Sequence, residues 1–279
     1  MNNQLVQAPI SALQAVVLGI VQGLTEFLPI SSSAHLKVVP AILHWPYQGV
    51  AYDAVIQLGS VLAVLTYFAK DIWKIVYGAS KRVEQDVRML GAIIIGTAPV
   101  CVLGLLLKHV IEQDNSPLRS FMVIGVASIF MGLFLLVAEK LGTHKRTIGT
   151  IGGKDGLLVG FGQAMALIPG CSRSGSTLTV AMLLNLKRED AARFSFLLGI
   201  PAIVLAGLFE LYGMVKNNAL QGAAMSDLLI GLVASTIVSY AAIAWFLKYL
   251  QQHSTWVFVW YRLLFGATVL ILSATHMIQ

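Results

Sequence analysis

Charged residues are scarce in this chain: they make up only 11% of its 279 residues, whereas 57% are hydrophobic. A soluble domain is about one quarter charged, so the composition excludes an ordinary soluble domain and predicts a membrane protein. The net charge of +6 does not indicate nucleic-acid binding, because the basic residues lie in short stretches between apolar segments and orient such a protein. No soluble domain remains that a membrane anchor would carry.

Cysteine is also scarce. Cys101 and Cys171 both lie in apolar or motif sequence, which excludes a disulfide framework and a cysteine metal site. Residues 1–8 lack the basic stretch that begins a cleavable signal, so none is expected.

Apolar segments occupy most of the chain. Six are long enough to cross a bilayer, which takes about 20 helical residues, and these are 51–69, 89–107, 119–138, 194–212, 227–247 and 256–276. Four shorter segments form two pairs, 9–28 with 34–43 and 156–168 with 175–186. The pairs are interrupted at Pro29 and at Pro169-Gly170, which end helices. Each pair is therefore predicted to be a re-entrant helix–loop–helix.

An internal repeat accompanies these pairs. Shifts of 141 or 140 residues superpose Gly19 on Gly160, Gln22 on Gln163, Ser31 on Ser172, Ser33 on Ser174, Pro29 on Pro169 and Gly59 on Gly199. Each copy has the order broken pair then three spans, which inverts the second copy. The sequence thus predicts an all-α polytopic membrane protein, a single domain over 1–279, with repeats at about 9–138 and 156–276.

The basic residues predict the orientation. Thirteen fall on one side of this topology: Lys70, Lys74, Lys81, Arg82, Arg88, Lys140, Lys145, Arg146, Lys154, Lys187, Arg188, Arg193 and Lys248. The other side has only Lys37, Lys108, Arg119 and Lys216. The positive-inside rule places the thirteen in the cytoplasm, and both termini and the first broken pair on the outer side. Arg262, close to Trp256 and Trp260, is interpreted as an interfacial anchor.

Polar residues precede the first interruption. Gln22 and Glu26 are spaced i and i+4 and share a helix face. An intramembrane carboxylate needs a partner or a proton, which indicates a functional role for Glu26. For Gln22, function and hydrogen bonding as packing between helices are equally good interpretations.

Three serines and a histidine follow. Ser31, Ser32 and Ser33 exceed what a helix cap needs, and His35 lies one turn beyond the first two. Its imidazole is therefore predicted to reach one of their hydroxyl groups, which would supply a nucleophile and a base.

The second interruption has the character of an anion site. Arg173 carries a planar fork suited to phosphate, and Gly170 allows backbone N–H groups to approach a ligand. A helix that starts here directs its positive end to the same place. Hydroxyl groups come from Ser172, Ser174, Ser176 and Thr177.

At these residues the chain resembles the undecaprenyl-diphosphate phosphatase family, also called bacitracin-resistance phosphatases. The two signatures are Gln22-Gly23-Leu24-Thr25-Glu26-Phe27-Leu28-Pro29-Ile30-Ser31-Ser32-Ser33-Ala34-His35 and Pro169-Gly170-Cys171-Ser172-Arg173-Ser174-Gly175-Ser176-Thr177. The resemblance implies hydrolysis of undecaprenyl diphosphate to the monophosphate in the bacterial inner membrane, a divalent cation such as Mg²⁺ or Ca²⁺, and the inverted-repeat fold.

The resemblance also implies site residues. Glu26, His35 and Arg173 match positions that the family treats as catalytic, and Ser32 matches a proposed nucleophile. The first signature position is commonly Glu but here is Gln22, which cannot shuttle a proton. Substrate-binding roles are expected for Gln22, Ser31, Ser33, Gly170, Ser172, Ser174 and Thr177, and Glu26 is the expected metal ligand.

The predicted mechanism has Arg173 hold the terminal phosphate while His35 takes the proton of Ser32, which attacks phosphorus. Direct attack by water, with Ser32 only binding, is the alternative. The rival function is a secondary transporter or flippase for an anionic lipid, since inverted repeats and broken helices suit it equally well. The partners are the lipid substrate and membrane lipid, and a homodimer is compatible with the sequence.

Overall fold

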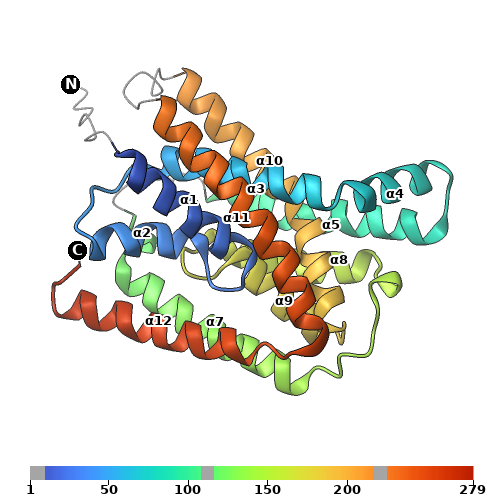
Figure 1. The fold of residues 1–279 in the computed structure, drawn as a ribbon. Helices are drawn as coiled ribbons and strands as arrows, with labels where there is room; N and C mark the ends of the chain where they lie inside the picture. Colours follow the sequence, from blue (N-terminus) through green and yellow to red (C-terminus); the bar gives the residue numbers. More distant parts are fainter. Residues whose placement is uncertain (1–9, 108–115, 217–224, 279) are drawn as a thin grey trace.

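The computed structural model describes residues 10–107, 116–216 and 225–278, and these ranges contain helices and one isolated β-bridge but no strand. The predictions that residues 1–8 contain no cleavable signal and that Lys108 lies on the outer side concern residues outside these ranges. The helices (Figure 1) are α1 Ala12–Phe27, α2 Ser32–Ile42, α3 Gly49–Tyr67, α4 Ala69–Ser80, α5 Glu84–Leu106, α7 Phe121–Leu141, α8 Gly153–Ala164, α9 Arg173–Leu183, α10 Arg188–Lys216, α11 Met225–Gln252 and α12 Trp256–Ala274.

Five of these helices are long and apolar enough to cross a membrane, namely α5, α7, α10, α11 and α12. A sixth span is counted if the bent pair of α3 and α4, which changes direction by 63°, is taken as one. The chain is therefore an all-helical integral membrane protein with five or six candidate spans. The basic stretch between the predicted spans 51–69 and 89–107 contains α4 and the start of α5, which project together from the body (Figure 1).

Two breaks interrupt the shorter helices where proline and glycine predicted them. The first break, residues 28–31, separates α1 from α2, and the second break, residues 165–172, separates α8 from α9. Each break ends on a serine with positive φ, 77° at Ser31 and 69° at Ser172. Such backbone is uncommon for a residue with a side chain and concentrates at functional sites.

The helices pack in pairs that bring distant parts of the sequence together. Helix α1 lies on α11, α8 lies on α5, and α7 lies on α12. Small residues permit this close approach. A Cβ on Gly19 would lie 2.5 Å from the carbonyl oxygen of Gly231, and a Cβ on Gly160 would lie 2.3 Å from the carbonyl oxygen of Gly96. These contacts hold α1 and α8 rigidly, and each of these two helices leads into a break.

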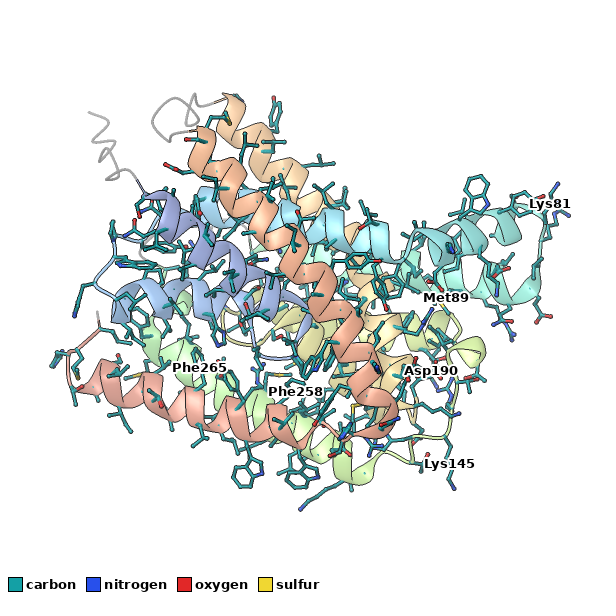
Figure 2. All side chains as sticks on the ribbon, in the orientation of Figure 1. Lys81, Met89, Lys145, Asp190, Phe258 and Phe265 are labelled. Carbon is teal, nitrogen blue, oxygen red and sulfur yellow. The ribbon has the colours of Figure 1, made fainter. Side chains whose placement is uncertain are left out.

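Aromatic residues pack around the end of α1, next to the first break. Phe27, the last residue of α1, is fully buried and meets Phe196 of α10 edge to face, with ring centroids 5.2 Å apart. Phe246 and Phe258 extend this cluster into α11 and α12. All side chains are drawn in Figure 2, where Lys81 and Lys145 lie toward the end of the molecule opposite the C-terminal end of α12.

Candidate active site

A single buried arginine joins the two breaks. Arg262 of α12 is 1% exposed and donates to the carbonyl oxygens of Pro29 (2.9 Å) and Gly170 (2.6 Å). It also donates to Ser128 (3.2 Å) and Cys171 (3.3 Å). The prediction that Arg262 is an interfacial anchor is therefore wrong, because its charge is stabilised by backbone carbonyls deep in the protein.

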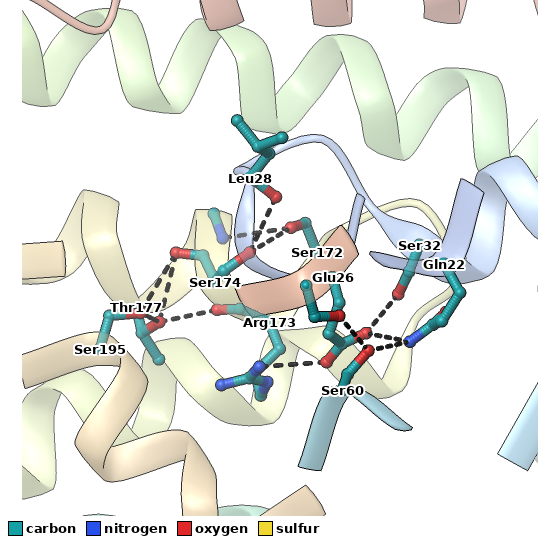
Figure 3. A network of polar contacts seen from close by, with 12 residues as sticks. Gln22, Glu26, Leu28, Ser32, Ser60, Ser172, Arg173, Ser174, Thr177 and Ser195 are labelled. Carbon is teal, nitrogen blue, oxygen red and sulfur yellow. Dashed lines mark hydrogen bonds and ion pairs between the residues drawn. The ribbon is translucent and has the colours of Figure 1, made fainter. Parts of the chain in front are cut away.

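Glu26 receives hydrogen bonds from both halves of the chain (Figure 3). One carboxylate oxygen, Oε1, accepts from Nη2 of Arg173 at 3.0 Å, across the two breaks. The other, Oε2, accepts from Oγ of Ser32 at 2.7 Å and from Nε2 of Gln22 at 3.1 Å. Ser60 of α3 accepts a second hydrogen bond from Gln22 at 3.3 Å. A buried carboxylate, a guanidinium and a serine hydroxyl thus form one network.

Arg173 has unused donors. Its Nε and Nη1 are buried and have no hydrogen-bond partner among the described residues, although a buried polar atom is normally paired. Gly199 of α10 leaves the space for this guanidinium, because a Cβ at that position would overlap Nη1. These two donors lie on different edges of the guanidinium, and each is suited to an anionic oxygen such as that of a phosphate.

Hydroxyl groups of the second break fix the start of α9. Oγ of Ser172 accepts from the backbone N–H of Gly175 at 3.1 Å and contacts Oγ of Ser174 at 3.2 Å. Ser174 donates to the carbonyl of Leu28 at 3.0 Å, which adds a second link between the breaks. Thr177 donates to the carbonyl of Arg173 at 2.8 Å and contacts Ser195. These side chains hold the arginine and the positive end of α9 in place.

Gly170 is required by its backbone. Its φ of 97° favours glycine, and a Cβ would lie 2.7 Å from the carbonyl oxygen of Ile124. In this structure the residue shapes the second break, and its carbonyl binds Arg262.

His35 is not directed at a serine hydroxyl. Its Nδ1 lies 2.7 Å from the carbonyl oxygen of Ser31, and its Nε2 lies 2.6 Å from the hydroxyl of Tyr261. A carbonyl only accepts, so Nδ1 carries the proton, and in the neutral ring Nε2 accepts from Tyr261. The predicted contact between the imidazole and a hydroxyl of Ser31 or Ser32 is therefore wrong, because other partners occupy both ring nitrogens.

Ser31 and Ser33 lie beside the network. Their hydroxyl groups are 3.3 Å apart, with Ser31 buried and Ser33 exposed. Ser32 is the serine of the first break whose hydroxyl contacts Glu26.

The described residues contain no group of three or more His, Cys, Asp or Glu side chains that could hold a metal ion. Glu26 is the carboxylate of the network, and Gln22 adds an amide where a second carboxylate would add charge. Mg²⁺ commonly binds through one or two carboxylates together with the phosphates of a substrate, and Glu26 fits that pattern.

Four residues that contact the network or the breaks were not predicted as site residues: Ser60, Gly199, Tyr261 and Arg262. Gly199 had a signal, since the 140-residue shift already paired it with Gly59. Tyr261 and Arg262 are adjacent polar residues inside an apolar span, a position that is costly unless the groups are used.

The fold and site define an integral membrane protein in which two helix breaks meet at a buried network of an arginine, a carboxylate and a serine. Residues 15–268 match the family described as "Bacitracin resistance protein BacA", and the chain belongs to this family. Similar relatives are the "Undecaprenyl-diphosphatase" proteins of Trichormus variabilis, 54% identical over 92% of this chain and 82% of the relative, and of Synechocystis sp., 52% identical over 94% and 82%. The protein of that name from Gloeobacter violaceus is 51% identical over 98% of this chain and 95% of its own.

Proposed function

We propose that this protein hydrolyses undecaprenyl diphosphate to undecaprenyl phosphate and inorganic phosphate. The relatives that match nearly the whole chain are named for this activity. The observation that carries the proposal here is the buried pair of unpartnered N–H groups on Arg173, next to a serine that donates to a carboxylate.

The geometry favours Glu26, rather than His35, as the base. Oγ of Ser32 attacks the terminal phosphorus while its proton passes along the existing 2.7 Å hydrogen bond to Oε2 of Glu26. The bond from phosphorus to the bridging oxygen breaks, and undecaprenyl phosphate leaves with that oxygen. Water then cleaves the phosphoserine, which releases inorganic phosphate and restores the hydroxyl. Direct attack by water remains the alternative mechanism.

Arg173 stabilises the charge on the transferred phosphoryl group through one of its two unpaired donors, Nε or Nη1, while Nη2 stays on Glu26. His35, fixed by Tyr261 and Ser31, lies one helical turn beyond Ser31 and Ser32 and positions the start of α2. Its proposed role is thus to orient the first break rather than to deprotonate Ser32.

A divalent cation is part of the proposal. Arg173 and Arg262 bring two positive charges and Glu26 one negative charge, while a diphosphate brings more negative charge than this balance neutralises. Glu26 together with diphosphate oxygens would hold the cation, which would supply charge neutralisation at the phosphates. Removal of the cation with a chelator is expected to abolish phosphate release.

The finer topology also belongs to the proposal. Breaks at matched positions, both ending on a positive-φ serine, and the matched packing of α1 on α11 and α8 on α5 support an inverted repeat with two re-entrant pairs. The basic residues support a site that opens to the outer side of the bacterial inner membrane. A homodimer remains a prediction.

The test is phosphate release from undecaprenyl diphosphate by the purified protein. Ser32→Ala and Glu26→Gln are expected to lower kcat by about 10²–10⁴-fold, whereas Ser80→Ala, at an exposed position of α4 outside the site, is expected to stay active. Binding without turnover, combined with lipid movement between leaflets, would favour the rival flippase or transporter instead.

A further inference from the structure

An apolar pocket lies on the membrane-facing side of the site. Its volume is about 530 Å³, its lining is almost entirely apolar, and it is formed by the end of α1, the first break, α11 and α12. Leu28 and Ile30 contribute one wall, and Ala241, Trp245 and Phe258 contribute others. Trp245 is 51% exposed, so the pocket opens outward between these helices.

The pocket shares the first break with the candidate active site. Leu28 and Ile30 flank Pro29, whose carbonyl binds Arg262, and the carbonyl of Leu28 accepts from Ser174. Tyr261 lines the pocket, and its hydroxyl bonds to Nε2 of His35 at 2.6 Å. A molecule bound in this pocket therefore contacts the first break directly, at Leu28 and Ile30.

We propose that this pocket holds the isoprenoid units nearest the diphosphate, an assignment that rests on the function proposed above. A substrate with a charged head and a hydrocarbon tail needs an apolar channel that begins at the phosphate site and opens to lipid. The volume is within the range of about 300–1,000 Å³ for small-ligand pockets, which suits the proximal part of a long chain. The remainder of the chain stays in the bilayer.

The pocket contributes affinity through close packing more than through the hydrophobic effect. A tail that leaves lipid for an apolar pocket gains little from the hydrophobic effect, because the bilayer is equally apolar. What the pocket adds is shape: aromatic walls at Trp245, Phe258 and Tyr261 pack against a methyl-branched chain. Occupancy also packs against the ring of Tyr261, which holds His35.

The first test maps the tail directly. A prenyl diphosphate with a photoreactive group on its second isoprene unit is irradiated with the full-length protein in detergent, and the labelled peptides are identified. Labels are expected within residues 237–245 or 257–261. Labels confined to other helices, for example the exposed face of α5, would overturn the assignment. The map does not need turnover, so it fails or succeeds independently of the phosphatase assay.

The second test fills the pocket. Ala241 lines it and is exposed, so Ala241→Phe adds bulk there without disturbing the core. KM for undecaprenyl diphosphate is expected to rise about tenfold with kcat kept, the penalty typical of overpacking. The matched control is Ala98→Phe, at an exposed position on the spanning helix α5, which should leave KM unchanged. Equal KM values in the two variants would refute the proposal.

Discussion

Gly199 offers a sharp test of the site, because a single methyl group there acts on Arg173. A Cβ on Gly199 would lie 2.7 Å from Cζ of Arg173, whereas carbon atoms in contact are about 3.5–4.0 Å apart. The nearest atom, Nη1 of Arg173, would lie only 1.6 Å from the same Cβ, so the guanidinium has to withdraw by about 2 Å. Because that guanidinium is the end of a flexible side chain, the helix does not need to move. Gly199→Ala should therefore displace the phosphate-binding group and leave the fold intact.

The expected loss of activity follows from that displacement. A misplacement of even about 1 Å in a catalytic geometry costs about 10²-fold, so kcat/KM for phosphate release is expected to fall by about 100-fold or more. The melting temperature in detergent should stay close to that of the wild type, since alanine is also the better helix former. Gly91→Ala on α5 is the control, because a Cβ there meets nothing within 4 Å.

Activity of Gly199→Ala within about threefold of wild type, against the expected 100-fold loss, would mean that Arg173 does not contact the reacting phosphate. A large fall in melting temperature would instead assign the effect to folding, and the displacement argument would then have failed.

Three further predictions concern the arginines and Tyr261. Arg173→Lys keeps the charge but loses the fork, so kcat should fall by about 10²–10³-fold in the phosphate-release assay; near wild-type turnover would contradict the role given to Arg173. Arg262→Met removes the hydrogen bonds to Pro29 and Gly170 and should lower the free energy of unfolding by about 3 kcal/mol or more, measured by thermal unfolding; unchanged stability would show that the breaks do not need it. Tyr261→Phe keeps the pocket wall but loses the bond to His35, so kcat should fall about fivefold with KM unchanged, and a rise in KM alone would refute this.

Local pattern was sufficient to place the helices. Apolar length predicted the spans, and Pro29 and Pro169-Gly170 predicted both breaks to within a few residues. The exception is α4, which lies in a segment with many basic residues. Its apolar side chains, such as Trp73 and Tyr77, occur on one face of the helix, and the charged residues between them made the segment resemble a loop.

The residues of the site were predictable from the sequence, but their hydrogen-bond partners were not. Glu26 and Arg173 were identified from their chemistry and Ser32 from the family resemblance, and the prediction that the two breaks meet is confirmed by the ion pair between Glu26 and Arg173. The partners of Arg262 are backbone carbonyls from distant segments. Every residue has such a carbonyl, so the sequence carries no signal for this contact.

The histidine shows why helical spacing alone misleads. Spacing placed His35 within reach of Ser31 and Ser32, yet its ring is turned toward α12, where it stacks on Phe265 with centroids 4.3 Å apart. Tyr261 and Phe265 lie more than 220 residues away in the sequence, so only the packing of α12 decides which way the imidazole points.

The most direct test of the account is an experimental structure of the protein with orthovanadate, which imitates a phosphoryl group during transfer. We expect vanadium between Oγ of Ser32 and the guanidinium of Arg173, with a vanadate oxygen on an unpaired donor of that arginine and Glu26 still beside the serine. Vanadate bound elsewhere, or Ser32 and Arg173 facing separate cavities, would contradict the claim that the two breaks build one phosphate site.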